Sequence, residues 1–392
     1  MTPVPRSYGF VEEALEKRSS CRQFRTLRPL FPTSAIEVET EGRTMVNFCS
    51  NDYLGLSKHP LLIERSQEFS RRYGTGATAS RLICGTYQCM EEVEEKLARL
   101  KGTEAALILN SGYQANLSLL AALADRHALI LSDALNHRSI IEGARLARCE
   151  VIPYRHNDMG HLRELLEASL TRGYSRVLVV TESVFSMDGD CGDVDRLASL
   201  GAEYQIITIV DEAHATGVQG ARGMGLACDG KADICVGTFG KALGSFGAYF
   251  ALSQRMRDYM VNYCSGFIYS TALPPPVVGA IDAALDLVPS MEKERREIRQ
   301  KAEYLRDALH ALGFDTGDSI TQIVPVLIGG EEETLALSKK LEESGLLALA
   351  VRPPTVARGE SRIRLTLSVL HTDEHIRRLV DGFRRWSWEH GQ

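Results

Sequence analysis

Short runs of aliphatic and β-branched residues alternate with segments of helical periodicity through the middle of the chain. This alternation is typical of an α/β layer sandwich with a mainly parallel central sheet. The last two runs are separated only by a glycine-rich connection, too short for a parallel crossover, so the final strand is free to run antiparallel. Strands are predicted over 106–110, 128–133, 150–154, 176–183, 206–212, 233–239 and 247–253.

The pattern changes after a proline-rich stretch at 273–276. A long amphipathic segment, 277–312, predicts one connecting helix, and a smaller α+β unit follows it. Its expected elements are strands at 322–328, 346–351 and 361–368, and helices at 331–344 and 373–388. We therefore expect three parts: an N-terminal arm (1–56), a large α/β domain (57–276), and the connecting helix with a small C-terminal domain (277–392).

Composition narrows the class of protein. Hydrophobic residues at 44% and charged residues at 24% of 392 describe an ordinary globular chain, and a net charge of -6 offers no general attraction to nucleic acid or anionic membrane. The nine cysteines are odd in number and form no C-x-x-C pair, which indicates reduced thiols rather than disulfides or a zinc site. The first residues lack a signal-peptide pattern, and no apolar run reaches membrane-spanning length. We expect a cytoplasmic protein with no metal site.

Polar residues follow the ends of several predicted strands, where ligands bind in open α/β sheets. Asp211 lies near the end of the run 206–212, and Lys241 and Ser186 follow two others. The run 106–110 leads into SGYQAN, which predicts a helix beginning near Ser111. A helix N-terminus suits a phosphate dianion, although Ser111 is equally typical of a plain N-cap.

Lys241 lies among small residues in TFGKALGSFG (238–247). A phosphate-gripping loop would need G-x-x-x-x-G-K-[ST], and here Ala242 follows the lysine, so that interpretation fails. The same absence argues against reading DEAH (211–214) as an ATPase motif. A solvated lysine fits poorly beside Ala242 and Leu243. The remaining interpretation is a lysine whose amine does covalent chemistry.

Two other patterns are weaker. GTGATA (74–79) approximates a dinucleotide-binding motif, but it follows no buried strand and opens no obvious helix, which favours a backbone turn. His156, Asp158 and His161 suggest metal ligands, but without further spaced ligands a loop with a helix start is favoured.

Pyridoxal phosphate uses the parts that the strand ends supply: a lysine for covalent attachment, an acid beside the pyridine nitrogen, and an anion cradle. Asp211 is the candidate acid, with a buried N-cap as the alternative. His214 could approach the phenolic oxygen, and His137 could stack on the ring, but either is also compatible with a structural histidine. Thr238, three residues before Lys241, could serve the phosphate.

Dense motifs across almost the whole chain support this interpretation. Together they resemble the α-oxoamine synthases, pyridoxal-phosphate enzymes of the aspartate-aminotransferase fold. The resemblance implies an α/β fold with a large mainly parallel-sheet domain and a smaller C-terminal α+β domain. The segments that carry it are SNDYLGL (50–56), SGY (111–113), LNH (135–137), TESVFSMDGD (181–190), DEAHATG (211–217), TFGKALG (238–244), IYSTALPP (268–275), RPPTV (352–356) and SRIRLTL (361–367).

The resemblance also implies roles for individual residues. Lys241 would hold the cofactor covalently, Asp211 would face the pyridine nitrogen, His214 the phenolic oxygen, and His137 would stack on the ring. It implies a homodimer with shared active sites, because one segment reaches the phosphate of the neighbouring subunit. That segment supplies Ser270 and Thr271; the other implied cofactor contacts are Ser111, Gly112, Tyr113, Ser186 and Thr238, and the implied substrate contacts are Arg25, Asn51, His137, Thr355 and Arg364.

Two of the segments, IYSTALPP and RPPTV, most resemble family members that condense L-alanine with a pimeloyl thioester, carried on coenzyme A or an acyl carrier protein. The expected reaction releases CO₂ and a free thiol, with Lys241 as the base at Cα and Arg364 holding the alanine carboxylate. The alternatives are a synthase that uses glycine with acetyl-CoA or serine with a long-chain acyl thioester, an aminotransferase, and a cofactor-free interaction protein.

The chain departs from the family at Met90, where relatives usually carry a histidine in a G-x-x-x-x-H-x-x-[LV]-E pattern. Any polar contact of that histidine is therefore lost. We expect repacking at the start of a helix rather than a change of acyl substrate.

Overall fold

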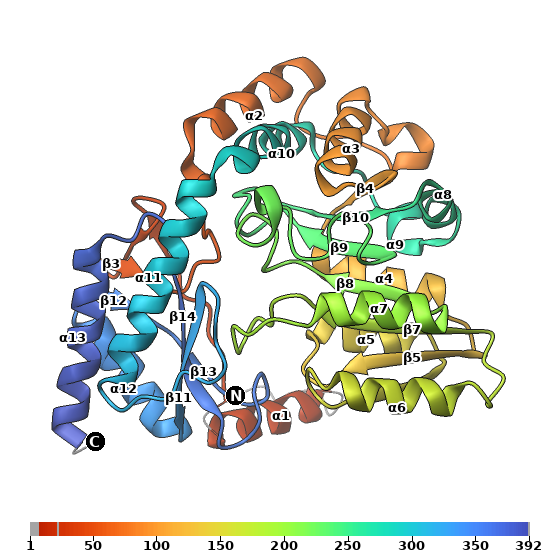
Figure 1. Ribbon diagram of the computed structural model, residues 1–392. Helices are drawn as coiled ribbons and strands as arrows, with labels where there is room; N and C mark the ends of the chain where they lie inside the picture. The colour runs from red at the N-terminus through yellow and green to blue at the C-terminus, as the bar shows by residue number, and fades with distance from the viewer. Residues whose placement is uncertain (1–7, 22, 391–392) are drawn as a thin grey trace.

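The fold is centred on a seven-stranded sheet of order β4-β10-β9-β8-β7-β5-β6 (Figure 1). The computed structural model describes residues 8–21 and 23–390, so residues 1–7 of the predicted arm and 391–392 lie outside it. β10 pairs antiparallel with β4 and β9, and the other neighbouring pairs are parallel. The strands are β4 (Ala105–Leu109), β5 (Ala128–Asp133), β6 (Glu150–Tyr154), β7 (Arg176–Glu182), β8 (Ile207–Asp211), β9 (Ile234–Thr238) and β10 (Ala248–Leu252).

Every expected strand of this sheet is present, with its ends shifted by a residue at most. Most of their side chains are buried on both faces, which explains the continuous apolar runs in the sequence. The short glycine-rich connection between β9 and β10 does return the chain antiparallel, as its length allowed.

Helices cover both faces of the sheet (Figure 1). One apolar cluster joins the sheet to Leu119, Ile140 and Met260, and another joins its other face to Leu97 and Leu197. The first face carries α4 (Gly112–Leu123), α5 (Arg138–Leu146), α8 (Gln254–Tyr263) and α9 (Ser265–Ile268); the second carries α2 (Pro60–Tyr73), α3 (Gln88–Lys101), α6 (Met159–Ser169), α7 (Val194–Tyr204) and α10 (Pro275–Leu287).

The prediction of one connecting helix over 277–312 is wrong. The chain forms α10, a 3-10 turn η5 (Val288–Ser290) and α11 (Glu292–His310). Pro289 lies in the turn, and a proline has no N–H to continue an α-helix and crowds the preceding turn. The amphipathic period continues on both sides of the break and concealed it.

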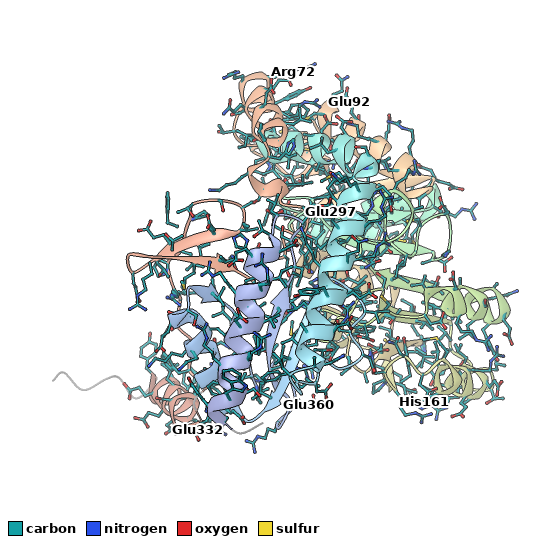
Figure 2. The ribbon with its side chains drawn as sticks, turned by 60° about the vertical axis from the view of Figure 1, so that its left-hand side comes forward. Arg72, Glu92, His161, Glu297, Glu332 and Glu360 are labelled. Carbon is teal, nitrogen blue, oxygen red and sulfur yellow. The ribbon has the colours of Figure 1, made fainter. Side chains whose placement is uncertain are left out.

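The C-terminal part packs α11 and α13 (Asp373–His390) side by side (Figures 1 and 2). α12 (Glu331–Glu343) lies near them, beside a three-stranded antiparallel sheet of order β11-β14-β13. The strands of this sheet are β11 (Ile323–Gly329), β13 (Ala350–Val351) and β14 (Ser361–Thr366).

The single strand expected at 346–351 is two strands in different sheets. β12 (Leu346–Leu347) pairs parallel with β3 (Arg43–Asn47), whereas β13 pairs with β14. Between them the N–H of Leu349 donates to Cys49 Sγ at 3.3 Å, so the ladder is interrupted there. The N-terminal segment therefore shares a sheet with the C-terminal part, through β1 (Phe31–Pro32), β2 (Glu37–Thr40) and β3.

The remaining elements are short or peripheral. None of the helices within 8–21 and 23–390 has the length and apolar character of a membrane span. Met90, in place of the family histidine, is fully buried in the apolar cluster around α3, in agreement with the expected repacking. The elements are α1 (Gly9–Ser20), the 3-10 turns η2 (Leu56–Lys58) and η4 (Ala221–Gly223), and the π-helical turn η3 (Arg81–Gly85).

Candidate active site

A cavity of about 190 Å³ opens at the carboxyl ends of β7, β8 and β9. It gathers an amine, two carboxylates and two imidazoles from segments that are far apart in the sequence. Its lining consists of Gly112, Tyr113, Asn116, His137, Ser139, Glu182, Asp211, Ala213, His214, Thr238 and Lys241.

Lys241 lies in the tight connection between β9 and β10. The connection is closed by hydrogen bonds from Phe239 N to Gly247 O and from Gly244 N to Lys241 O, both 2.9 Å. Gly244 has φ +63, and a Cβ there would lie 2.5 Å from the backbone of Leu56. Only glycine fits this position without strain, so the loop that carries the amine has one conformation.

The Lys241 amine faces His214 rather than a carboxylate. Its Nζ lies 2.6 Å from Nε2 of His214, whose Nδ1 lies 2.6 Å from the hydroxyl of Tyr53. Burial lowers the pKa of Lys241 to about 8 with help from the Arg364 charge, although Asp211 and Glu182 oppose it. Burial, followed by the charge of Lys241, lowers the pKa of His214 well below its usual value. Near neutral pH the cavity therefore holds a neutral imidazole beside a readily deprotonated amine.

Asp211 is fixed at the end of β8 by donors on both oxygens. The side-chain amide of Asn116 donates to Oδ2 at 2.7 Å, and the backbone N–H of Ala213 donates to Oδ1 at 2.8 Å. The same Asn116 amide donates to Ser139 Oγ at 3.0 Å, which lies 2.8 Å from Nδ1 of His137. One amide thus orients the carboxylate and, through Ser139, the imidazole.

Glu212 points away from this cavity. Its Oε2 lies 2.7 Å from Nζ of Lys101, and both side chains are completely buried. The amine also donates to Met224 O at 2.5 Å and to Thr216 Oγ1 at 3.3 Å. Because neighbouring strand residues face opposite sides of a sheet, Asp211 faces the cavity while Glu212 anchors the core behind it.

The start of α4 forms another wall. Ser111 is its N-cap and accepts a hydrogen bond from Gln114 N at 3.2 Å, while Gly112 and Tyr113 line the cavity. Thr238 Oγ1 accepts from Gly240 N at 3.1 Å and donates to Gly247 O at 2.8 Å. The helix N-terminus and the lysine loop therefore face the same space.

A second chain of contacts extends from the lysine to the C-terminal part. Both terminal nitrogens of the Arg364 guanidinium donate to Oδ1 of Asn51, at 3.3 and 3.2 Å, and the same oxygen accepts from the Tyr53 hydroxyl at 3.0 Å. Arg364 Nε also donates to Ser186 O at 2.5 Å. Arg364, Asn51, Tyr53, His214 and Lys241 are thus linked in one continuous network.

Other residues expected at the site lie outside the cavity lining. The Arg25 guanidinium donates to Thr355 Oγ1 at 3.1 Å, so these two lie together. Asn110 donates to Ser270 Oγ and to Thr271 O, both at 2.9 Å. Within the single chain Ser270 and Thr271 therefore contact Asn110, before α4, and Thr271 also forms an antiparallel bridge with Ser80; their role toward a second subunit stays a prediction.

Sequence reasoning missed four residues that the structure places in the cavity or its network. Tyr53 and Asn116 lie within SNDYLGL and SGYQAN, but nothing in those strings shows their partners. The sequence around Ser139 and Glu182 likewise gave no indication of their partners. Glu182 is buried and accepts from the backbone N–H of His137 at 2.5 Å; burial, followed by the Asp211 charge, raises its pKa well above the usual value. A glutamate at the end of an apolar strand was the signal available.

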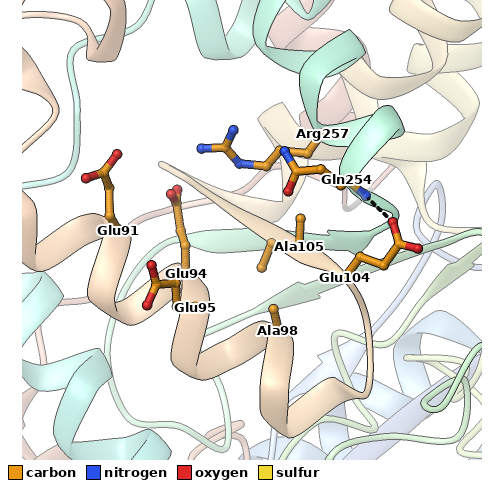
Figure 3. A pocket seen from close by; sticks show the side chains of 9 residues that line it. Glu91, Glu94, Glu95, Ala98, Glu104, Ala105, Gln254 and Arg257 are labelled. Carbon is orange, nitrogen blue, oxygen red and sulfur yellow. Dashed lines mark hydrogen bonds between the residues drawn. The ribbon is translucent and has the colours of Figure 1, made fainter.

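A separate cavity of about 260 Å³ lies beside α3 and is rich in acids (Figure 3). The carboxylate oxygens of its buried acid, Glu94, already have hydrogen-bond donors within the chain. Both of its oxygens accept from Arg81, at 2.7 and 3.0 Å, and Oε1 also accepts from Ile108 N at 2.9 Å. We assign this cavity no chemistry.

The 190 Å³ cavity fits pyridoxal phosphate. A carbonyl-reactive amine needs to be neutral, and the partner of Lys241 is an imidazole rather than an acid that would hold its charge. A pyridinium needs a buried carboxylate, which Asp211 supplies, and a phosphate needs unpaired backbone donors, which the start of α4 offers.

Comparison with known proteins agrees with this site. The model of the family "Aminotransferase class I and II" matches residues 43–383. The chain belongs to this family, and it is a pyridoxal-phosphate enzyme of fold type I with a large, mostly parallel sheet and a smaller C-terminal domain. Relatives named 8-amino-7-oxononanoate synthase match this chain over almost their whole length.

Two relatives illustrate the similarity. A protein of Desulfosudis oleivorans (strain DSM 6200 / JCM 39069 / Hxd3), provisionally named 8-amino-7-oxononanoate synthase, is 58% identical over 377 residues, covering 96% of this chain and 98% of its own. The 8-amino-7-oxononanoate synthase of Gluconacetobacter diazotrophicus is 46% identical over 391 residues, covering 97% and 98%.

Solved structures show the same fold. Sphingomonas wittichii serine palmitoyltransferase is 26% identical with a TM-score of 0.90, covering 100% of this chain and 99% of that one. The 8-amino-7-oxononanoate synthase of Francisella tularensis is 25% identical with a TM-score of 0.76, covering 89% and 99%. Similarity in shape alone therefore does not select between the two activities.

Proposed function

We propose that this enzyme condenses L-alanine with a pimeloyl thioester, releasing 8-amino-7-oxononanoate, CO₂ and the free thiol, a step of biotin biosynthesis. The observation that supports this reaction is a cavity lined by a low-pKa lysine and a fixed aspartate, with Arg364 joined to that lysine through a hydrogen-bond network. Sequence identity of 46 to 58% to relatives of that name, over nearly their whole length, supports the choice of substrates.

The proposed cofactor contacts follow the geometry. Lys241 would hold pyridoxal phosphate covalently, and Asp211 would keep the pyridine nitrogen protonated. His214 would lie beside the phenolic oxygen, and His137 would stack on the ring. The start of α4 and Thr238 would bind the phosphate, and Ser186 would contact the cofactor from the loop after β7. Bound pyridoxal phosphate supplies an electron sink for a carbanion at Cα of the amino acid.

Residues of this chain would bind the substrate and move the proton at Cα. Arg364 would bind the alanine carboxylate through the two nitrogens that now contact Asn51, and this hold would orient the Cα–H bond. Once released, the Lys241 amine would take the proton from Cα and later return one, because a pKa of about 8 suits a base near neutral pH. Arg25 and Thr355 are proposed as contacts of the acyl substrate.

We also propose a homodimer in which Ser270 and Thr271 of a second copy contact the phosphate. The exposed side chain of Tyr269, next to Ser270, supports this, because it is 84% exposed in the single chain. A monomer at working concentration with full affinity for the cofactor would exclude this arrangement.

A serine palmitoyltransferase activity is the second candidate, supported by the TM-score of 0.90 to the enzyme of that name. A substrate panel separates the two candidates. L-alanine, glycine and L-serine are each combined with pimeloyl-CoA, acetyl-CoA and palmitoyl-CoA, and thiol and CO₂ release are measured together. We expect both products only with alanine and the pimeloyl thioester. Turnover confined to serine with palmitoyl-CoA would replace the proposal with the second candidate.

A control identifies the lysine. The loaded protein is treated with borohydride, and the trapped cofactor peptide is found by mass spectrometry, with Lys241→Ala as the matched control. Trapping at another lysine would remove the basis of the proposal.

A further inference from the structure

Two loops that carry site residues meet at one imidazole outside the cavity. The first loop, 133–137, leads from β5 to His137, and the second, 183–192, follows β7 and carries Ser186. His156, in the connection between β6 and α6, lies between their acidic ends. It belongs to the group of polar residues that sequence analysis considered and rejected as a metal site.

Each ring nitrogen of His156 faces a carboxylate. Nδ1 lies 2.9 Å from Asp133 Oδ1, and Nε2 lies 2.9 Å from Asp190 Oδ2. The ring edge packs against Phe185 with centroids 4.4 Å apart and an interplanar angle of 89°. A ring nitrogen can bond an ionised carboxylate only by donating, so both nitrogens carry hydrogen and the ring is an imidazolium.

Within residues 8–21 and 23–390, His156 is the only cationic side chain that pairs with these two carboxylates. Apart from His156, the residues of the described chain that contact the side chains of Asp133 or Asp190 are neutral donors: the backbone N–H groups of Leu135 and Asn157 and the Asn157 amide. The Asp133 side chain is fully buried and that of Asp190 is 10% exposed. Burial opposes a charged imidazole, but hydrogen bonds to Asp133 and Asp190 raise the pKa of His156 to about 10.

Each aspartate is built into its loop, Asp133 through its carboxylate and Asp190 through its backbone carbonyl. Asp133 Oδ1 accepts from Leu135 N at 2.9 Å, which shapes the turn that ends at His137. In the second loop Phe185 N donates to Asp190 O at 3.1 Å and Gly189 N to Phe185 O at 2.9 Å, which places Ser186 at the tip. The carbonyl of Ser186 accepts from Arg364. A displacement of Asp190 would therefore reach Ser186 and Arg364.

We propose that His156 is a positioning residue of the active site: bridging Asp133 and Asp190, it sets the loop that carries His137 against the loop that carries Ser186. Its effect is expected in the affinity for pyridoxal phosphate and for the substrate carboxylate. The inference rests on the proposed function, because the roles of His137, Ser186 and Arg364 belong to it. His156 touches neither cofactor nor substrate.

The test compares His156→Gln with two controls. Glutamine is neutral and leaves the carboxylates uncompensated, whereas His156→Gln combined with Asp190→Asn also removes one of those charges. His161→Gln is the matched control, because His161 lies in the first turn of α6 and its Nδ1 accepts from Arg155 N, at 2.9 Å, rather than facing a carboxylate. Each protein is stripped of cofactor and titrated with pyridoxal phosphate by fluorescence, and its melting temperature is measured.

We expect His156→Gln to bind pyridoxal phosphate roughly tenfold more weakly, the size of a lost hydrogen bond to a charged group. In the loaded enzyme we expect KM for alanine to rise roughly tenfold with a smaller change in kcat, because Arg364 is displaced. The double variant is expected to recover most of the cofactor affinity, and His161→Gln to match the parent.

Cofactor affinity within twofold of the parent in folded His156→Gln, or an equal loss in His161→Gln, would overturn the proposal. If His156→Gln does not fold, Asp190→Ala alone replaces it, because alanine removes the acceptor on one side of the bridge, and unchanged affinity there has the same meaning. The titration needs neither alanine nor thioester. A parent protein that binds pyridoxal phosphate but condenses no alanine therefore refutes the proposed function, while the His156 comparison still gives an answer.

Discussion

The low pKa of the Lys241 amine leads to a prediction that can be tested without substrate or cofactor. Burial lowers this pKa from 10.5 to about 8, and three nearby charges also act on it, Asp211 and Glu182 raising it and Arg364 lowering it. Each pH unit below the pKa reduces the neutral fraction of an amine about tenfold. At pH 7 the neutral fraction of Lys241 is therefore expected to be about 300-fold larger than that of an ordinary lysine.

The assay is competitive labelling of the cofactor-free protein with a small amine-reactive reagent, with a free lysine derivative as internal standard. The rate at Lys241, read from its peptide by mass spectrometry, should rise with pH, reach half of its plateau near pH 8, where the amine is half neutral, and level off about one pH unit higher. The standard should keep rising by about two further pH units.

Two variants test the cause as well as the value. Asp211→Asn removes a negative charge that raises the pKa of Lys241, so the inflection should move below pH 8. Arg364→Met removes a positive charge that lowers the pKa, so the inflection should move above pH 8. A parent inflection near 10.5, or a shift of both variants in the same direction, would refute the electrostatic explanation.

Further predictions concern the groups behind and beside this amine. Lys101→Met should destabilise the protein by about 3–5 kcal/mol, because it leaves the fully buried Glu212 charge unpaired. The double variant Lys101→Met with Glu212→Gln should recover much of this loss. Both effects are read from melting temperatures. The exposed ion pair of Lys340 and Glu389 is the control, and Lys340→Met should cost less than about 1 kcal/mol of stability. Equal losses in the two lysine variants would contradict the reasoning. Tyr53→Phe removes the hydroxyl beside His214 and should slow condensation roughly tenfold in steady-state assays, with little change in cofactor affinity.

The large sheet was predictable from the sequence because its strands are buried on both faces and read as continuous apolar runs. The break in the connecting segment was missed because the helical period continues on both sides of Pro289, and the proline alone was the signal for it. The division of 346–351 between two sheets depends on partners about 300 residues away, such as Cys49, which no local pattern contains.

The residues of the active site also fall into those that the sequence predicted and those that it did not. Lys241, Asp211 and His214 follow strand ends, and the general rule that ligands bind at the carboxyl edge of an open sheet is enough to place them together. Tyr53 reaches His214 from 161 residues away, and Asn116 reaches Asp211 from 95. Such contacts depend on how distant segments pack. The motifs therefore include these residues but do not show which partners they have.

The adjacent acids at the end of β8 also limit how this chain can change by insertion or deletion. Asp211 faces the cavity and Glu212 faces Lys101, since successive strand residues alternate between the faces of the sheet. Removing one residue from β8 while keeping its pairing register at the start of the strand would exchange their sides. The core would then receive the shorter acid and the cavity the longer one. Length changes in this strand should therefore be tolerated only in pairs of residues.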